Sequence, residues 1–143
     1  MTHTIVAIAD QVVFALNASV LSQPLTAERR FRVEFGLDEL ETLRVSVVPK
    51  AVNQRAITRS KEMFDYEIDI GIQQKIPSED NVDIEPLLAL AEEILAFLRF
   101  QKLLALPDVT WLKAEHTPIY SAEHLGELRV FTSVLTVTYR RTA

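Results

Sequence analysis

Three carboxylates at alternate positions are the residues of this chain best spaced to hold a metal ion. Asp65, Glu67 and Asp69 would leave the same face of a strand, because alternate side chains of a strand point the same way. Carboxylate oxygens are the ligands that Ca²⁺ and Mg²⁺ prefer. Adjacent members of such a row lie about 7 Å apart, however, and neither a lysine at nuclease spacing nor a supporting histidine accompanies them. We expect a solvated strand face without a metal, and a small metal-dependent enzyme is the alternative.

The histidines, serines and glycines offer no recognisable catalytic motif. Glu115-His116 and Glu123-His124 are separated by eight residues across a segment that contains Pro118, which is no standard zinc spacing. No serine lies in a Gly-x-Ser-x-Gly elbow, and no base is evidently tied to any serine. The glycines form neither Gly-x-Gly nor Gly-Lys-Ser/Thr. We expect no catalytic residue and no cofactor.

The composition is that of an ordinary globular protein with one domain. The chain has 143 residues, of which 48% are apolar and 24% charged, and the whole of it, 1–143, is expected to form a single domain. The longest charge-free stretch, residues 11–27, contains several polar residues and Pro24, which argues against a transmembrane segment. No secretory signal is recognisable at the N-terminus. The absence of cysteine excludes disulfides, thiol nucleophiles and thiolate metal sites, and fits a reducing cytoplasm.

Charge is distributed unevenly along the chain. The net charge of −5 argues against a surface that binds nucleic acid throughout. Residues 49–61 nevertheless carry four basic residues and no acid, whereas residues 62–93 carry ten acids and the single base Lys75. The basic residues are Lys50, Arg55, Arg59 and Lys61. The two segments are either separate solvated faces or a complementary pair that meets across a subunit boundary.

Apolar periodicity predicts an α+β fold with a mainly antiparallel sheet of about five strands packed with two main helices. The helices are expected at residues 4–18 and from an Asp83 cap to about Leu103, with Pro86 in the first turn of the second. A turn or short helical piece is expected at residues 36–41 and another at 123–128. Strands are expected at residues 30–35, 42–48, 64–72, 110–115 and 127–141.

Several details of this arrangement bear on function. Phe31, Val33 and Phe35 share one face of the first expected strand. Pro49 is expected to end the second, so that residues 50–60 form a long loop, which in a compact domain is usually functional or mobile. Trp111 is expected to be a core or interface aromatic, as is Tyr120.

The last strand is about twice the usual length, because residues 127–141 run on without Gly or Pro. Its length has two interpretations. It is either a core strand within the subunit or an exposed edge that extends a sheet across a subunit interface.

The amino-acid sequences of several segments resemble those of the small tail terminator, or tail completion, proteins of long-tailed bacteriophages and prophages. The resemblance spans nearly the whole chain. It lies in the residue sequence of the segments and in their order along the chain, since none of the segments is a chemical motif. The similar segments are residues 21–29 (LSQPLTAER), 43–50 (LRVSVVPK), 64–72 (FDYEIDIGI), 92–94, 118–125 and 131–140.

The resemblance implies a structural, non-enzymatic role in the virion. Proteins of this family form a ring, typically a hexamer, that caps the tail tube at its head-proximal end, stops its polymerisation and presents the surface for head-tail joining. The implied partners are further copies of the chain, the major tail-tube protein and a neck or head-completion protein, and assembly takes place in the host cytoplasm. DNA passes through the channel without specific binding, and no membrane is involved. A head-completion or other neck (connector) protein is the alternative.

Within this hypothesis the charged segments receive roles. The basic residues Lys50, Arg55, Arg59 and Lys61 are expected to contact the tail tube or the neighbouring subunit. A ring needs two different patches that complement each other. Asp65, Glu67 and Asp69 are expected to face the channel, where carboxylates would repel the phosphates of the passing DNA.

Overall fold

A computed structural model describes residues 4–33, 37–77, 81–103, 105–117 and 119–143. It confirms the α+β class, with one mixed five-stranded sheet, two longer helices and two short helical turns. The elements in chain order are α1 Thr4–Asn17, β1 Ala27–Arg29, η1 Leu37–Glu41, β2 Arg44–Ala56, β3 Glu62–Lys75, α2 Asn81–Phe100, β4 Val109–Glu115, η2 His124–Leu128 and β5 Val130–Thr142.

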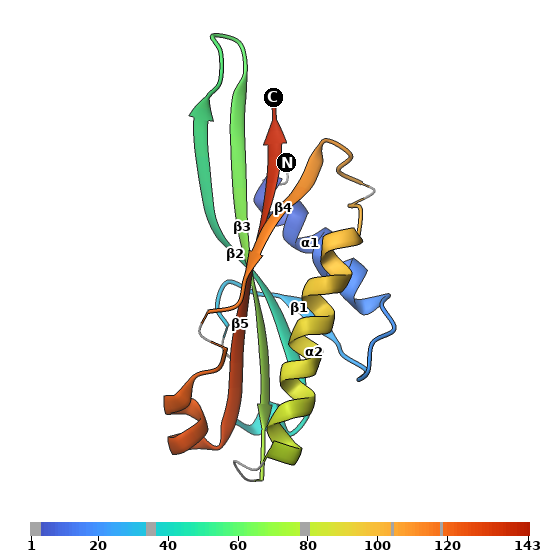
Figure 1. Ribbon diagram of the computed structural model, residues 1–143, viewed down its shortest axis with the longest axis vertical. Coiled ribbons are helices and arrows are strands. Elements are labelled where there is room, and N and C mark those ends of the chain that lie inside the picture. The colour runs from blue at the N-terminus through green and yellow to red at the C-terminus, as the bar shows by residue number, and fades with distance from the viewer. Residues whose placement is uncertain (1–3, 34–36, 78–80, 104, 118) are drawn as a thin grey trace.

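The sheet has the strand order β1-β2-β3-β5-β4. β1 runs parallel to β2, and every other neighbouring pair is antiparallel. β2, β3 and β5 have 13, 14 and 13 residues, so each is about 45 Å long. Figure 1 shows these strands crossing at a narrow, strongly twisted waist, with α1 and α2 against the same side of the sheet. Among the described residues, no helix is long and apolar enough to cross a membrane.

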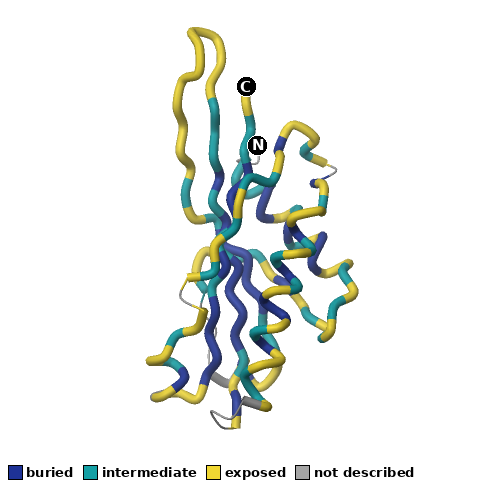
Figure 2. The backbone as a smooth tube through the Cα atoms, viewed as in Figure 1, coloured by how far each residue is buried: buried dark blue, intermediate teal, exposed yellow. Residues whose placement is uncertain are grey.

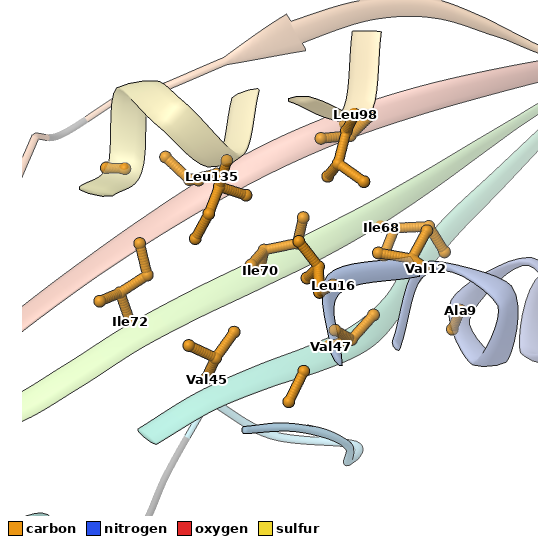
Figure 3. Close-up of a cluster of buried hydrophobic side chains, with 14 of the residues drawn as sticks. Ala9, Val12, Leu16, Val45, Val47, Ile68, Ile70, Ile72, Leu98 and Leu135 are labelled. Carbon is orange, nitrogen blue, oxygen red and sulfur yellow. The ribbon is translucent and has the colours of Figure 1, made fainter. Parts of the chain in front are cut away.

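The core lies between the two helices and one face of the sheet. Each helix buries a stripe at i, i+3 and i+4 spacing, and alternate apolar residues of each long strand join this core, as the sequence patterns predict. The buried side chains labelled in Figure 3 are Ala9, Val12 and Leu16 of α1, Leu98 of α2, Val45 and Val47 of β2, Ile68, Ile70 and Ile72 of β3, and Leu135 of β5. These contacts fix both helices to one face of the long strands, with α1 beside the waist and α2 along the part below it (Figure 1).

The long strands therefore have two different halves. In the half below the waist in Figure 2, the strands are mostly buried, whereas in the hairpin that projects above it the tip and one strand are exposed and the other strand is largely intermediate. We call residues 44–49, 68–75 and 130–137 the packed half, and residues 51–63, the projecting part of the β2–β3 hairpin, the arm. Every residue from Val52 to Glu62 in the arm is exposed.

The first expected strand is wrong in its position. β1 is only three residues long and pairs with Val45–Val47 of β2. After Arg30, whose backbone N–H donates to the Val47 carbonyl at 3.0 Å, the chain bends instead of extending. Phe31 is consequently 70% exposed, and the Arg29 guanidinium lies 5.2 Å from its ring centroid. Phe35 lies outside the described residues.

Val33 has a different role from the one that its alternation suggests. A Cβ atom added to Gly71 of β3 would collide with the Val33 side chain and lie 2.7 Å from Ser46 Oγ. Val33 thus covers the sheet face opposite the helices at the one strand position that has no side chain. This cover, with the helices on the other side, buries the packed half from both faces.

The expectation that Pro49 ends the second strand is also wrong, and residues 50–60 are not a long loop. β2 continues to Ala56, with a register shift between Pro49 and Ala51. β1 covers β2 only as far as Val47, so Pro49 lies on an edge, where a missing N–H and a bulge are tolerated. Only residues 57–61 connect the strands, and the arm has no burial pattern because both its faces meet solvent.

Two further boundaries differ from expectation. α2 begins at Asn81, two residues before the expected Asp83 cap, which places Pro86 beyond the first turn, and it ends at Phe100. β5 lies between β3 and β4 over residues 136–141, so this part is an interior strand of the subunit, whereas β4 does not extend along residues 130–135, which pair with β3 alone among the described strands. The expected helical turns near residues 36–41 and 123–128 are confirmed.

Candidate functional surface

The sheet face opposite the helices is charged beyond the waist. β3 places Asp65, Glu67 and Asp69 on this face, because they alternate with the buried residues of the same strand. The neighbouring strands contribute basic residues to it, so opposite charges lie side by side across the strands. We call this set the charged face, and it comprises Lys50, Arg55, Asp65, Glu67, Asp69, Lys113, Glu115 and Arg140.

Asp65 forms the best-defined ion pair of the charged face. Arg140 of β5 is its cross-strand partner and donates two hydrogen bonds to it, from Nε to Oδ1 at 2.7 Å and from Nη2 to Oδ2 at 3.0 Å. These bonds lower the pKa of Asp65 from its usual 3.8, partial burial opposes them, and Arg55 and Lys113 assist. Arg140 was not among the residues expected to be functional, although its alternation with the buried Tyr139 could have placed it on this face.

Asp69 and Glu67 also have polar neighbours. The Thr136 hydroxyl donates to Asp69 Oδ1 at 2.7 Å, and the Lys50 ammonium lies 3.7 Å from the same oxygen. Asn53 Nδ2 is 3.5 Å from a carboxylate oxygen of Glu67. Each of the three acids expected to face a channel is therefore engaged with a polar or basic side chain of its own subunit.

The arrangement of these acids does not resemble a metal site. Nowhere in the described parts of the chain do three His, Cys, Asp or Glu side chains come together in a group that could hold a metal ion. The strand spacing separates the carboxylates along β3, and each carboxylate accepts a hydrogen bond from a side chain of an adjacent strand. The four acids and four bases of the charged face balance, so this face attracts neither sign of charge strongly.

The four basic residues expected to act together divide into two groups. Lys50 lies at the waist beside Asp69, and Arg55 lies beside Met63, with 3.2 Å between Nη2 and Sδ. Arg59 and Lys61 belong to the exposed turn at the tip of the arm. The first group is bound to its own sheet, whereas the second reaches into solvent.

The turn that presents Arg59 and Lys61 is held by its own hydrogen bonds. The backbone N–H groups of Ile57 and Thr58 donate to the Lys61 carbonyl at 2.9 and 3.2 Å. The Thr58 hydroxyl oxygen accepts from the N–H groups of Ser60 and Lys61 at 3.3 and 3.1 Å. The tip therefore has a defined shape and presents its two cations from a fixed backbone.

The basic and acidic segments of the sequence meet within one subunit. β2 and β3 are consecutive antiparallel strands, so the hairpin itself brings the basic stretch against the acidic one. Gln54 Nε2 also donates to Glu62 at 2.8 Å, near the end of the arm. A contact of either segment with a second subunit remains a prediction.

On the side of the hairpin opposite the charged face, apolar and aromatic side chains lie beside Gln54 and Arg141. Val52 and Ile57 are 49% and 47% exposed, and Phe64 stacks on Tyr66 with 6.1 Å between the ring centroids. The Arg141 guanidinium lies 4.7 Å from the Phe64 centroid and donates to the Tyr66 hydroxyl at 3.3 to 3.4 Å. The arm thus offers different chemistry on its two sides.

The histidines attach a surface segment to β5. His124 Nδ1 is 2.8 Å from the Thr132 hydroxyl, and His116 Nε2 is 2.6 Å from Ser133 Oγ. The expectation that no base is tied to a serine is therefore wrong for Ser133. Ser133 is 1% exposed and donates to the Ile119 carbonyl at 2.7 Å, so its oxygen accepts from His116. This geometry holds the segment before η2 in place.

Comparisons with known proteins assign no family to the chain. None of the models of known protein families matches it, and none of the curated proteins is significantly similar to it.

Proposed function

We propose that this protein is the subunit of a ring that caps the tail tube of a long-tailed bacteriophage or prophage, ends tube polymerisation and forms the head-tail joining surface. The observation that carries the proposal is the arm, a hairpin that projects beyond the packed body and ends in a shaped, cationic tip. A projecting element of this kind contributes nothing to its own core and is suited to contact a second molecule. The resemblance in sequence to tail terminators supplies the identity of that molecule.

The two edges of the sheet support assembly into a ring. β2 has no described strand beside it past Val47, and β4 has none on its side away from β5. The edges differ in sequence and lie on opposite sides of the molecule, so a contact between them would join unlike surfaces of successive subunits. Contacts of unlike surfaces generate rings when the rotation closes, and six copies are expected from the resemblance.

The positions of the basic residues support different roles for the tip of the arm and for the strands that carry it. Arg59 and Lys61 are proposed to contact the end of the tail tube, because they are the exposed cations at the tip. Lys50 is proposed to order the base of the arm, because it neighbours Asp69. Arg55 is proposed to order the strands below the tip, because it pairs with Met63 and neighbours Asp65. The charged face is proposed to line the channel, where its balanced charges let DNA pass without binding.

The test reverses the charge at the tip of the arm. An Arg59→Glu/Lys61→Glu variant should fold normally, because both side chains are exposed, but it should yield tails of uncontrolled length or tails that fail to join heads. Electron microscopy of the assembled particles measures the result. Lys75→Glu/Arg129→Glu is the matched control, since it changes net charge equally at exposed positions of the opposite end of β3 and β5.

Normal-length tails joined to heads in the tip variant would contradict the proposed role of the tip. The shape of particles assembled without the protein distinguishes a tail terminator from a head-completion protein. Overlong, tube-like polymers support the terminator, whereas full heads that leak DNA beside free tails of normal length support a head-completion protein instead.

A further inference from the structure

A pocket of about 740 Å³ lies on the helix side of the sheet, away from the charged face. Its walls come from the C-terminal end of α2, the segment that follows it, and the strands β4 and β5. The side chains that matter for its chemistry are Arg99, Phe100, Lys102, Trp111 and Tyr139. The volume is within the range of ordinary ligand sites, and we call it the Trp111 pocket.

Two buried donors of this pocket have no acceptor. The indole Nε1 of Trp111 and the hydroxyl of Tyr139 have no hydrogen-bond partner among the described residues. Tyr139 is 1% exposed, and burial raises the pKa of its phenol, so the hydroxyl keeps its proton and remains a donor. Unpaired buried donors are unfavourable, which means that an occupant with acceptor oxygens would gain from binding here.

The rim of the pocket is cationic and aromatic. The Arg99 guanidinium lies 5.6 Å from the Trp111 ring centroid and 5.5 Å from that of Phe100. Phe100 is 79% exposed, and Lys102 is exposed on the same rim. The described lining contains no acidic residue. A complementary occupant therefore carries an apolar group together with a negative charge.

The neighbouring edge of β4 indicates the form of this occupant. β4 is the last strand of the sheet, and no described strand pairs with its outer side. Such an edge can bind an extended peptide through backbone hydrogen bonds, while pockets beside it accept alternate side chains. An extended segment that paired with β4 would pass the mouth of the Trp111 pocket.

We propose that the Trp111 pocket and the edge of β4 together bind an extended segment of another protein, through an aromatic side chain and a carboxylate two residues apart. Residues two apart leave an extended chain on the same face. The aromatic ring fills the pocket, the carboxylate pairs with Arg99 at the rim, and acceptor oxygens of the segment take the bonds offered by Trp111 and Tyr139.

The test uses the only tryptophan of the chain as its probe. A ¹⁵N-labelled protein gives one indole N–H resonance, which reports directly on Trp111. The peptide acetyl-Thr-Phe-Thr-Glu-Thr-amide should shift this resonance saturably. Replacing the peptide's Phe by Ala should abolish the shift, and replacing its Glu by Gln should weaken binding about tenfold, the usual scale for one charge-assisted hydrogen bond.

Variants of the protein test separately the ion pair with Arg99 and the hydrogen bond from Tyr139. Arg99→Gln should weaken binding of the Glu peptide about tenfold and leave the Gln peptide unchanged, which is the coupling expected of a direct pair. Arg129→Gln is the matched control, because it removes the same charge at an exposed position outside the pocket lining and should bind like the wild type. Tyr139→Phe should weaken both peptides without lowering thermal stability, since it removes a donor that has no partner in the free protein.

Three outcomes overturn the inference. The first is an indole resonance that does not move at millimolar peptide. The second is equal affinity of the Glu and Gln peptides, which removes the role of Arg99. The third is a shift of the indole resonance on raising the protein concentration alone, lost in Arg99→Gln, which assigns the pocket to a second copy of this chain.

Discussion

The arm continues β2 and β3, two of the three strands that form the packed half, but the two regions differ in what surrounds them. In the packed half, Ile68, Ile70 and Ile72 of β3 are fully buried, with α1 and α2 on one face and Val33 over Gly71 on the other. In the arm, the strands continue with regular pairing, yet every residue from Val52 to Glu62 is exposed. The comparison shows that strand pairing and burial are separable along one continuous hairpin.

The difference indicates that the packed half supplies the stability of the fold, and it leaves the arm available for recognition. Burial of apolar side chains supplies the main favourable term of folding, and the packed half contains most of it. The arm gains little from burial and depends on its ladder, its turn and the charged face for order. Substitutions in the two halves should therefore differ in size and in kind.

The largest expected effect is that of Ile70→Ala in the packed half. Ile70 is fully buried, so truncation should lower the free energy of unfolding by about 3 to 4 kcal/mol, through lost burial and the cavity left behind. Urea unfolding measures the change. Val52→Ala, the corresponding truncation at a residue of the arm that is 49% exposed, should cost less than about 1 kcal/mol, and equal losses at both positions would break the comparison.

A smaller effect is expected at Gly71, where the two faces of the packed half meet. Gly71→Ala should lower the free energy of unfolding by about 1 to 3 kcal/mol, because the new methyl group would collide with Val33 and crowd Ser46. Val33→Ala in the same chain should recover part of this loss, as a double-mutant cycle would show. Simple additivity of the two losses would mean that Val33 does not cover Gly71.

The smallest effect is expected on the charged face, and it depends on pH. The hydrogen bonds from Arg140 lower the pKa of Asp65 below 3.8, so the pair stabilises the fold above that pH, and this contribution is lost as the pH falls through the lowered pKa. Asp65→Asn should be less stable than the wild type at neutral pH. Urea unfolding across the acid range should show the two stabilities converge as the pH falls through the lowered pKa, whereas a constant difference would remove the role of the charge.

The sequence predicted the fold well where burial leaves a pattern. Alternation placed β3 within three residues at each end and β4 within one, and helical spacing placed both helices, because these elements bury one face more than the other. The prediction was wrong at Phe31 and at Pro49. A pattern of apolar residues cannot reveal that Val33 packs over Gly71 without being part of a strand, or that a strand passes a proline on an unpaired edge.

The candidate site was predictable only in part, for a related reason. The acids of β3 were placed on one face correctly, since alternation alone decides that. Their partners Arg140, Lys50 and Asn53 follow from the register between strands, which no single strand encodes. The Trp111 pocket depends on where α2 ends relative to β4, and the sequence offered Trp111 only as a core or interface aromatic.

The interior position of β5 has a consequence for synthesis. β3 pairs with β5 over 13 residues, yet α2 and β4 separate the two strands in the chain. As the chain emerges from the ribosome, the β2–β3 hairpin can form early. The edge of β3 that pairs with β5, however, has no hydrogen-bonding partner until β5 has been synthesised. An apolar strand edge in that state is prone to wrong pairing. The nascent protein is therefore most vulnerable to aggregation between the completion of its first hairpin and the arrival of β5.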